Sequence, residues 1–229
     1  MKRYHQYCPV ARAAEILAER WTLLVVRELL DGEARFNAIQ RGVPRMSPSL
    51  LATRLRELQR TGIVERRLVD GEPRYRLTEA GRELEPVLRQ MGAWGVRWMQ
   101  NLRPDEFDPV LLMLDIRRNA SPDRLPEKAA TVQVLFRDAP SGSDRWWLVL
   151  SRAGGAEVCD VDPGHPVTVW LDTDVPTLTR VWTGDLPWPT ALRDEAVRLH
   201  GDRPACRALP EWLVGPFTPV PRAENPLPR

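Results

Sequence analysis

Hydroxyl and arginine side chains recur along residues 47–60 at a spacing that suits nucleic-acid recognition. When this segment is wound as a helix, at about 100° per residue, one side carries four polar residues: Ser49, Thr53, Arg56 and Arg60. Arg45 lies just upstream, and Arg54 lies on the flank. Short hydroxyls and guanidinium groups can hydrogen-bond base edges and phosphates in a major groove. A solvated helix face is the alternative that this segment alone leaves open.

The helix that would carry these side chains has recognisable ends. Ser47-Pro48 combines a favoured N-cap residue with proline at the first helical position, and Gly62 is a natural C-terminal stop. The opposite side of the helix is aliphatic, with Leu51, Leu55 and Leu58. Three shorter helices are predicted before it, over residues 9–17, 21–30 and 36–41.

Two short alternating runs follow this helix. Residues 63–69 and 74–78 are predicted to be strands, separated by a turn at residues 70–73. Three helices, an arginine-bearing helix and a hairpin form the order of a winged helix-turn-helix, in which the last long helix enters the groove and the hairpin touches the flanking backbone. The candidate DNA-binding residues are Arg45, Ser47, Ser49, Thr53, Arg54, Arg56, Arg60, Arg67 and Arg74.

Most of residues 7–100 resembles the HxlR-type winged-helix transcription regulators. The matching motifs occur in the family's order: Cys8-Pro9-Val10, Arg20-Trp21-Thr22-Leu23-Leu24, Arg27-Glu28-Leu29, Arg35-Phe36, Ser47-Pro48, Leu51 to Leu58, Gly62-Ile63-Val64-Glu65-Arg66 and Tyr75-Arg76-Leu77-Thr78-Glu79-Ala80-Gly81. The resemblance implies a homodimer that binds a double-stranded DNA operator through the helix beginning at Ser47 and the wing at residues 70–74. Some members sense redox state or electrophiles through a cysteine at the position of Cys8, which is therefore a candidate redox sensor. A packed structural thiol is the alternative.

A last helix of this half is predicted after Thr78, with a kink at Pro86. It carries an apolar stripe that one small domain cannot cover completely. The stripe is predicted to be the dimerisation surface, since two-fold symmetric DNA readers need a partner helix; packing on the domain's own core is the alternative. The candidate dimerisation residues are Leu84, Leu88, Met91, Trp94 and Trp98.

Charge divides the chain into two halves. Residues 1–103 carry 19 basic and 12 acidic side chains, whereas residues 104–229 carry 14 and 19. A basic half is the electrostatic footprint of a polyanion binder. We therefore expect a DNA-binding and dimerisation domain over residues 1–103, a second domain over residues 104–214 and a proline-rich tail over residues 215–229.

The second half is predicted to form an α+β domain with an antiparallel sheet, because alternating runs are followed by helical patterns. The runs occupy residues 131–137, 145–151, 156–161, 167–172 and 197–199; the helical patterns begin at residues 174, 190 and 203. Residues 110–118 suit either a helix or a strand.

Residues 108–214 are similar to sterol carrier protein-like domains. The similar segments are Trp146-Trp147-Leu148-Val149, Val158-Cys159-Asp160, Asp162-Pro163-Gly164, Leu178 to Asp185, Ala191-Leu192-Arg193-Asp194 and Gly201-Asp202 to Leu213. This resemblance implies a curved sheet packed on helices around a tunnel for a small apolar ligand, and aromatic side chains suit such a lining. The candidate ligand-binding residues are Trp146, Trp147, Trp170, Trp182, Trp188 and Trp212. An ordinary aromatic core is the alternative for each of them.

Other function classes find little support. No G-x-G-x-x-G, Walker A, G-x-S-x-G or H-E-x-x-H motif occurs, so we expect no enzyme and no cofactor. Three scattered cysteines suit neither a disulfide framework nor a C-x-x-C metal site. The apolar runs are too short for a membrane span and no secretory signal is recognisable, so a cytoplasmic protein is expected.

The sequence thus predicts a homodimeric repressor whose operator affinity responds to an apolar ligand in the second domain. Two rivals stay open. The second half is either a lipid-carrier module that the winged helix tethers, or a structural cap that leaves Cys8 as the sensor.

Overall fold

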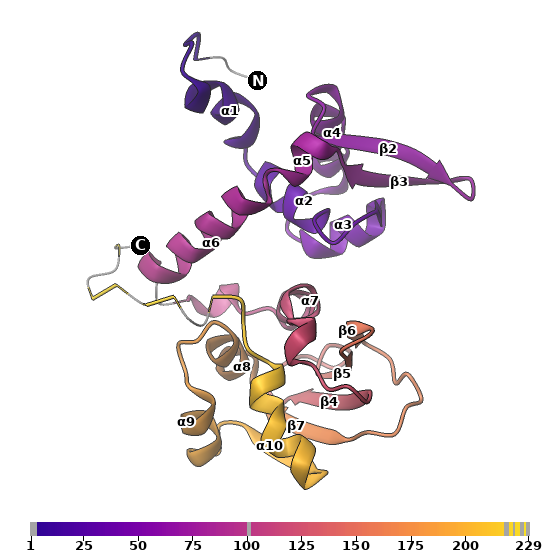
Figure 1. The fold of residues 1–229 in the computed structure, drawn as a ribbon, viewed down its shortest axis with the longest axis vertical. Helices are drawn as coiled ribbons and strands as arrows, with labels where there is room; N and C mark the ends of the chain where they lie inside the picture. Colours follow the sequence, from indigo (N-terminus) through magenta and orange to yellow (C-terminus); the bar gives the residue numbers. More distant parts are fainter. Residues whose placement is uncertain (1–3, 100–101, 218–219, 222, 225–226, 228–229) are drawn as a thin grey trace. The chain divides into compact units, whose positions relative to one another are not determined.

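The computed structural model describes residues 4–99, 102–217, 220–221, 223–224 and 227. The chain divides into two compact units, Met1–Gly92 and Ala93–Arg229, each with its own sheet and helices (Figure 1). The division falls inside helix α6, Glu85–Trp98, whereas the sequence analysis places it between residues 103 and 104. Much of the expected proline-rich tail lies outside the described residues.

The first unit is a winged helix. Its elements are α1 Pro9–Leu17, α2 Thr22–Glu28, β1 Ala34–Arg35, α3 Phe36–Gly42, α4 Pro48–Arg60, β2 Val64–Val69, β3 Glu72–Leu77, α5 Glu79–Arg82 and the first part of α6. The three strands pair antiparallel in the order β1-β3-β2. The predicted helices and hairpin are confirmed. Strand β1 was not predicted, because two residues are too few to show an alternating pattern.

Leucines of α4 anchor the core of this unit. Leu51, Leu55 and Leu58 are buried, as predicted from their spacing. They pack in one cluster with apolar residues from α2, α3 and the hairpin, among them Val25, Val26, Ile39, Val64 and Leu77. This packing fixes which side of α4 faces outward.

The hairpin turns within two residues. Asp70 has φ 53° and Gly71 has φ 79°, and Val69 pairs with Glu72 on the other side. Two central residues with positive φ fit the twist of an antiparallel hairpin, and glycine adopts this conformation without steric cost.

The helix predicted after Thr78 is broken rather than kinked. Helix α5 ends at Arg82, and α6 begins at Glu85, so Pro86 is the second residue of a new helix. Proline has no N–H to bond the carbonyl of Arg82, and its ring would clash there. The chain avoids the clash by ending one helix and starting another.

The second unit has a mixed sheet. Its elements are α7 Pro109–Asn119, β4 Ala130–Phe136, β5 Arg145–Ser151, β6 Gly155–Cys159, β7 Val169–Thr173, α8 Val175–Trp182, α9 Trp188–Arg193, β8 Arg198–Gly201 and α10 Arg203–Trp212, with short 3-10 turns at Pro104–Glu106 and Pro122–Arg124. The strand order is β6-β5-β4-β7-β8. The expectation of a purely antiparallel sheet is wrong, because β4 and β7 are parallel. Alternation reveals which side of a strand is buried, but it does not reveal the direction of the neighbouring strand.

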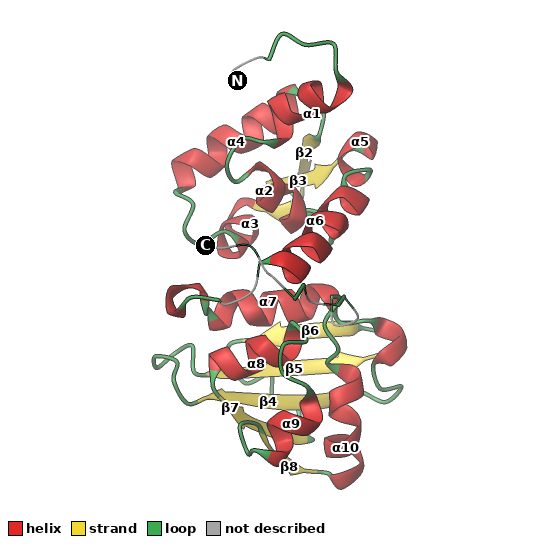
Figure 2. Ribbon diagram, turned by 90° about the vertical axis from the view of Figure 1, so that its left-hand side faces the viewer, coloured by secondary structure: helices red, strands yellow, loops and turns green. Residues whose placement is uncertain are grey.

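Helices cover one side of this sheet. Helices α8, α9 and α10 lie in front of the strands in Figure 2. Alternate residues of the central strands, such as Val132, Leu148 and Leu171, are buried in a single cluster with residues of these helices and α7. The connection from β6 to β7 passes on the other side of the sheet (Figure 1).

Candidate nucleic-acid interface

Helix α4 is capped at both ends by its own sequence. The hydroxyl of Ser47 accepts a hydrogen bond from the backbone N–H of Leu50 at 3.3 Å, and Pro48 occupies the first turn. At the other end, Gly62 has φ 77°, and its N–H donates to the carbonyl of Gln59. These caps satisfy backbone groups that the helix leaves unpaired and hold its ends in place.

A polar network covers the outward side of α4. Arg56 Nη2 donates to Thr53 Oγ1 at 3.1 Å, and the Thr53 hydroxyl donates to the carbonyl of Ser49 at 3.0 Å. The hydroxyls of Ser47 and Ser49 lie 3.2 Å apart. All of these side chains are exposed, as are Arg45 and Arg60. This side therefore presents hydroxyls near the helix start and guanidinium groups further along, an arrangement able to contact base edges and phosphates.

Arg54 does not lie on this exposed side. Its side chain is 10% exposed, with Nη1 2.5 Å from Glu57 Oε2 and Nη2 3.6 Å from Glu19 Oε2. Glu19 belongs to the segment between α1 and α2. A guanidinium held between two carboxylates is already neutralised, so Arg54 ties α4 to that segment instead of facing a polyanion.

The wing carries a row of arginines across all three strands. Arg74 on β3 lies directly opposite Arg67 on β2 and Arg35 on β1. Residues in register on neighbouring strands share one side of a sheet, and like charges placed opposite one another repel. Arg35 was not among the predicted site residues, because the two-residue strand that aligns it with Arg74 has no sequence signature. We call Arg35, Arg74 and Arg67 the arginine row.

The neighbouring row of the wing is neutralised within the molecule. Glu65 lies opposite Arg76, and Arg76 Nε donates to Glu65 Oε1 at 2.5 Å. This hydrogen bond lowers the pKa of Glu65; burial acts in the opposite direction, and the charge of Arg67 adds to the lowering. Glu65 is thus the anionic partner of Arg76, while Arg67 lies further off at 3.6 Å.

The predicted dimerisation residues divide into two groups. Leu84 and Leu88 pack against the core of the first unit. Met91 and Trp94 are exposed, at 51% and 52%, as is Val87. Trp98 is half-buried, and the guanidinium of Arg97 lies over its ring, 5.6 Å from the ring centroid. The exposed apolar surface of α6 is therefore made by Val87, Met91 and Trp94.

The three cysteines are unpaired thiols in different surroundings. Cys8 is half-buried at the N-cap of α1, a helix with no buried residue. Cys159 ends β6, and Cys206 lies in α10. Burial, together with the charge of Asp202, raises the pKa of the Cys206 thiol. Cys206 is therefore a poor nucleophile at neutral pH.

The six predicted ligand-binding tryptophans do not converge on one site. Trp146 and Trp182 are buried in the core between sheet and helices, and Trp188 and Trp212 pack against it. Two indole groups there are satisfied: Trp182 Nε1 donates to Asp115 Oδ2 at 2.7 Å, and Trp188 Nε1 donates to the Leu213 carbonyl at 3.1 Å. Trp147 and Trp170 belong to the other side of the sheet, since each alternates with core residues.

Metal sites and membrane-spanning helices are both absent from the described residues. Within them, no three His, Cys, Asp or Glu side chains are grouped so that they could hold a metal ion. No helix among them combines the length and the apolar character needed to cross a membrane.

Comparisons with known proteins agree on the first unit. Residues 16–103 match the family model described as HxlR-like helix-turn-helix. YvaP of Bacillus subtilis, described as an uncharacterized HTH-type transcriptional regulator, is 36% identical over 98 residues, which are 41% of this chain and 91% of YvaP. The HTH-type transcriptional regulator YodB of the same organism is 40% identical over 91 residues, which are 38% of this chain and 81% of YodB. The structure of reduced YodB is 35% identical, covers 42% of this chain and 97% of YodB, and has a TM-score of 0.37.

Proposed function

Because the chain belongs to the HxlR-like helix-turn-helix family, we propose that it is a sequence-specific DNA-binding transcription regulator that acts on an operator as a homodimer. The observation that carries the proposal is the exposed hydroxyl and arginine side of α4, held outward by three buried leucines. In this function α4 lies in the major groove, where Ser49, Thr53 and Arg56 face base edges.

The arginine row supports a second contact, with the DNA backbone. Three guanidinium groups in register repel one another in the free protein, and a phosphate between them removes that cost. The neighbouring Glu65–Arg76 pair shows how the same sheet neutralises a charge when no external anion is needed. Arg35, Arg67 and Arg74 would therefore fix the position of the protein on the duplex without reading its sequence.

The homodimer is proposed from the exposed apolar surface of α6. Val87, Met91 and Trp94 lie within two turns of one helix and are all exposed. Burying such a group against the same group of a second copy gives a two-fold symmetric contact, which matches the two half-sites of an operator. Met91→Glu should convert the dimer to a monomer in sedimentation, whereas Arg89→Glu, on an exposed neighbouring position, should leave it a dimer.

The second unit is proposed to be a ligand-sensing domain of the sterol carrier protein-like kind. A mixed sheet covered by helices on one side, with Trp146 and Trp182 in the layer between them, supports this proposal. Binding of an apolar ligand there would change operator affinity through the coupling of two sites on one chain. We also propose that the protein acts as a repressor. Measuring whether its regulated genes are expressed more or less strongly in its absence would distinguish repression from activation.

A second candidate regulation is redox control through Cys8. The thiol is half-buried beside a helix that has no core contacts of its own, so a modification at Cys8 would meet little resistance from packing. Diamide should weaken operator binding of the wild type and leave Cys8→Ser unaffected. Equal weakening of both proteins would contradict a role for Cys8.

The direct test of the proposed function is selection of genomic DNA fragments by the full-length protein. The wild type should enrich a few fragments that share one two-fold symmetric motif. The double variant Thr53→Val/Arg56→Ala should lose this motif, whereas Arg193→Ala, which removes an exposed arginine of the second unit, should retain it. Enrichment without any shared motif would contradict sequence-specific recognition.

A further inference from the structure

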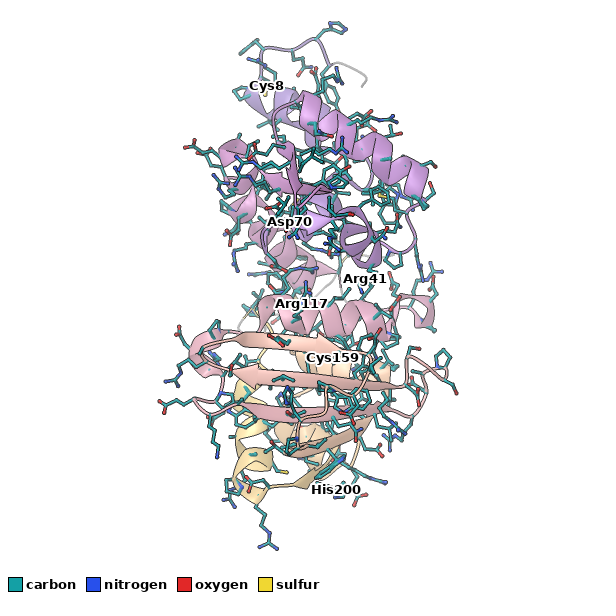
Figure 3. The ribbon with its side chains drawn as sticks, turned by 90° about the vertical axis from the view of Figure 1, so that its right-hand side faces the viewer. Cys8, Arg41, Asp70, Arg117, Cys159 and His200 are labelled. Carbon is teal, nitrogen blue, oxygen red and sulfur yellow. The ribbon has the colours of Figure 1, made fainter. Side chains whose placement is uncertain are left out.

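Five residues form a continuous row across the five-stranded sheet, on the side that faces away from helices α8, α9 and α10. Strand register pairs Cys159 with Trp147, Trp147 with Gln133, Gln133 with Trp170, and Trp170 with His200. Partners in register point to the same side of a sheet. We call Cys159, Trp147, Gln133, Trp170 and His200 the aromatic row; Figure 3 looks onto this side, with Cys159 and His200 labelled on the two edge strands.

The row faces away from the helices. Residues that alternate with its members, such as Leu148, Val132 and Leu171, are buried in the core cluster, and no member of the row belongs to that cluster. The row is therefore separate from the helix-covered layer in which Trp146 and Trp182 lie. A molecule bound to the aromatic row would touch neither of those two tryptophans.

Trp147 has an unsatisfied polar group. Its side chain is nine-tenths buried, at 7% exposure, and its Nε1 has no hydrogen-bond partner among the described residues. Buried indole N–H groups normally find an acceptor, as those of Trp146, Trp182 and Trp188 do. A missing acceptor at this one position indicates a place for an external oxygen atom.

Trp170 offers an open ring surface on the same row. It is 44% exposed. A Cβ added at Gly201 would lie 3.2 Å from Cε3 of its ring, so the absence of a side chain at Gly201 lets the indole lie close to the backbone of β8. A ring supported in this way on one side and exposed on the other is suited to stacking.

The spacing of the two tryptophans suggests the size of the ligand. Trp147 and Trp170 lie on strands separated by β4, which places their backbones about 10 Å apart at about 4.8 Å per strand. A compound with two fused rings can stack on one indole and reach toward the other. Gln133, between them, has a carboxamide that can both donate and accept hydrogen bonds.

We propose that the aromatic row binds a planar aromatic compound with a carbonyl oxygen, which stacks on Trp170 and accepts a hydrogen bond from Nε1 of Trp147. The side chains that cover Nε1 must shift to admit the oxygen, so the affinity is expected to be modest. This site does not depend on the proposed operator binding, and it differs in place and ligand from the apolar site proposed between sheet and helices.

The test uses full-length protein labelled with 5-fluorotryptophan and assigned through single Trp→Phe variants. Coumarin, which has two fused rings and a lactone carbonyl, should shift the fluorine resonances of Trp147 and Trp170 and leave those of Trp146 and Trp182 unchanged. Naphthalene has two fused rings but no acceptor and serves as the matched probe. Laurate, an acyl chain, tests the separate proposal of a ligand between sheet and helices through Trp146 and Trp182.

Two variants separate stacking from hydrogen bonding. Trp147→Phe retains an aromatic ring but removes the N–H, so it should weaken coumarin binding about 3- to 10-fold, the range of one net hydrogen bond, and leave naphthalene binding unchanged. Trp170→Ala, at an exposed position, should weaken both. The proposal is overturned if coumarin shifts neither Trp147 nor Trp170 up to its solubility limit, if it shifts Trp146 and Trp182 instead, or if Trp147→Phe binds coumarin as well as the wild type.

Discussion

The two sheets of this protein carry cross-strand rows of opposite character. The three-stranded sheet of the wing aligns Arg35, Arg74 and Arg67, whereas the five-stranded sheet aligns two tryptophans with Gln133 between them. The arginine row places three positive charges in register, and within the wing Glu65 compensates Arg67 only at 3.6 Å, so an external anion would relieve the remaining repulsion. The aromatic row has no net charge in its centre, but its buried Trp147 N–H has no acceptor within the part of the chain that the structure describes.

The difference shows how an unsatisfied interaction indicates the chemistry of a partner. Repulsion between guanidinium groups points to phosphate, which DNA supplies along its whole length. A single unpaired indole N–H points to one acceptor atom on a small molecule. Each row is either an interaction site or only a feature of its sheet, and substitutions in the two rows distinguish these possibilities.

The largest expected effect is on DNA binding by the arginine row. Arg74→Gln should make the salt dependence of operator binding less steep by about 2 per dimer, because one phosphate contact is lost from each protomer. It should also stabilise the free protein by up to about 1 kcal/mol, since a like-charge contact is removed. If the arginine row is functional, Arg74→Gln weakens DNA binding in titrations but raises the free energy of unfolding in urea. Trp170→Gln is the control and should leave the salt dependence unchanged.

Arg54 should behave in the opposite way to Arg74. Arg54→Met removes the partner of Glu57 and Glu19 and should destabilise the first unit by about 1 to 3 kcal/mol, which urea unfolding measures. The slope of log operator affinity against log salt should stay at its wild-type value, because Arg54 faces carboxylates and not DNA. A shallower slope in Arg54→Met would place this arginine among the phosphate contacts.

A smaller effect distinguishes two buried tryptophans. Trp182→Phe loses the hydrogen bond to Asp115 and leaves this carboxylate short of one donor. It should therefore lower the free energy of unfolding by about 1 to 2 kcal/mol. Trp147→Phe loses no hydrogen bond within the described residues, so it should lower the free energy of unfolding clearly less than Trp182→Phe does. Thermal unfolding of both variants measures the difference. An equal loss of stability would mean that the N–H of Trp147 has a partner after all.

The smallest expected effect is a pH dependence of the wing. The folded state holds the pKa of Glu65 below its unfolded value of about 4.5, so the Glu65–Arg76 pair contributes stability at neutral pH that is lost as pH falls through the folded pKa. Glu65 is partly exposed, so solvent screens the pair and the contribution is small. The protection factors of the β2 and β3 amides, which correct for the intrinsic pH dependence of hydrogen exchange, should fall as the pH is lowered below 4.5 in the wild type, and Arg76→Gln should reduce this change.

Local sequence signals were sufficient to predict most of the helices and strands of the first unit. Ser47 and Thr78 cap helices as predicted, and the burial of Leu51, Leu55 and Leu58 follows from their spacing along α4. These features depend on neighbours in the chain, which a sequence displays directly. The hairpin was also predicted, but its turn is Asp70-Gly71 and not residues 70–73, because Glu72 and Pro73 pair with Val69 and Leu68.

Long-range pairing explains what the sequence could not reveal. Arg54 is buried because it meets Glu19, 35 positions earlier in the chain, and helical spacing gives no sign of this pair. The parallel pairing of β4 with β7 aligns Trp170 with Gln133, and it also separates the six tryptophans into two sides of the sheet. Residue type alone had assigned all six tryptophans to a single ligand-binding site.

The most direct test of the central claim is the affinity of the full-length protein for its selected operator at increasing salt. A dimer that neutralises about 6 to 10 phosphates should show a slope of log affinity against log salt of about −5 to −9. A scrambled duplex of the same length should bind more weakly at every salt concentration. An affinity that does not change with salt, or that is equal for the operator and the scrambled duplex, would contradict a regulator that reads DNA through α4 and the arginine row.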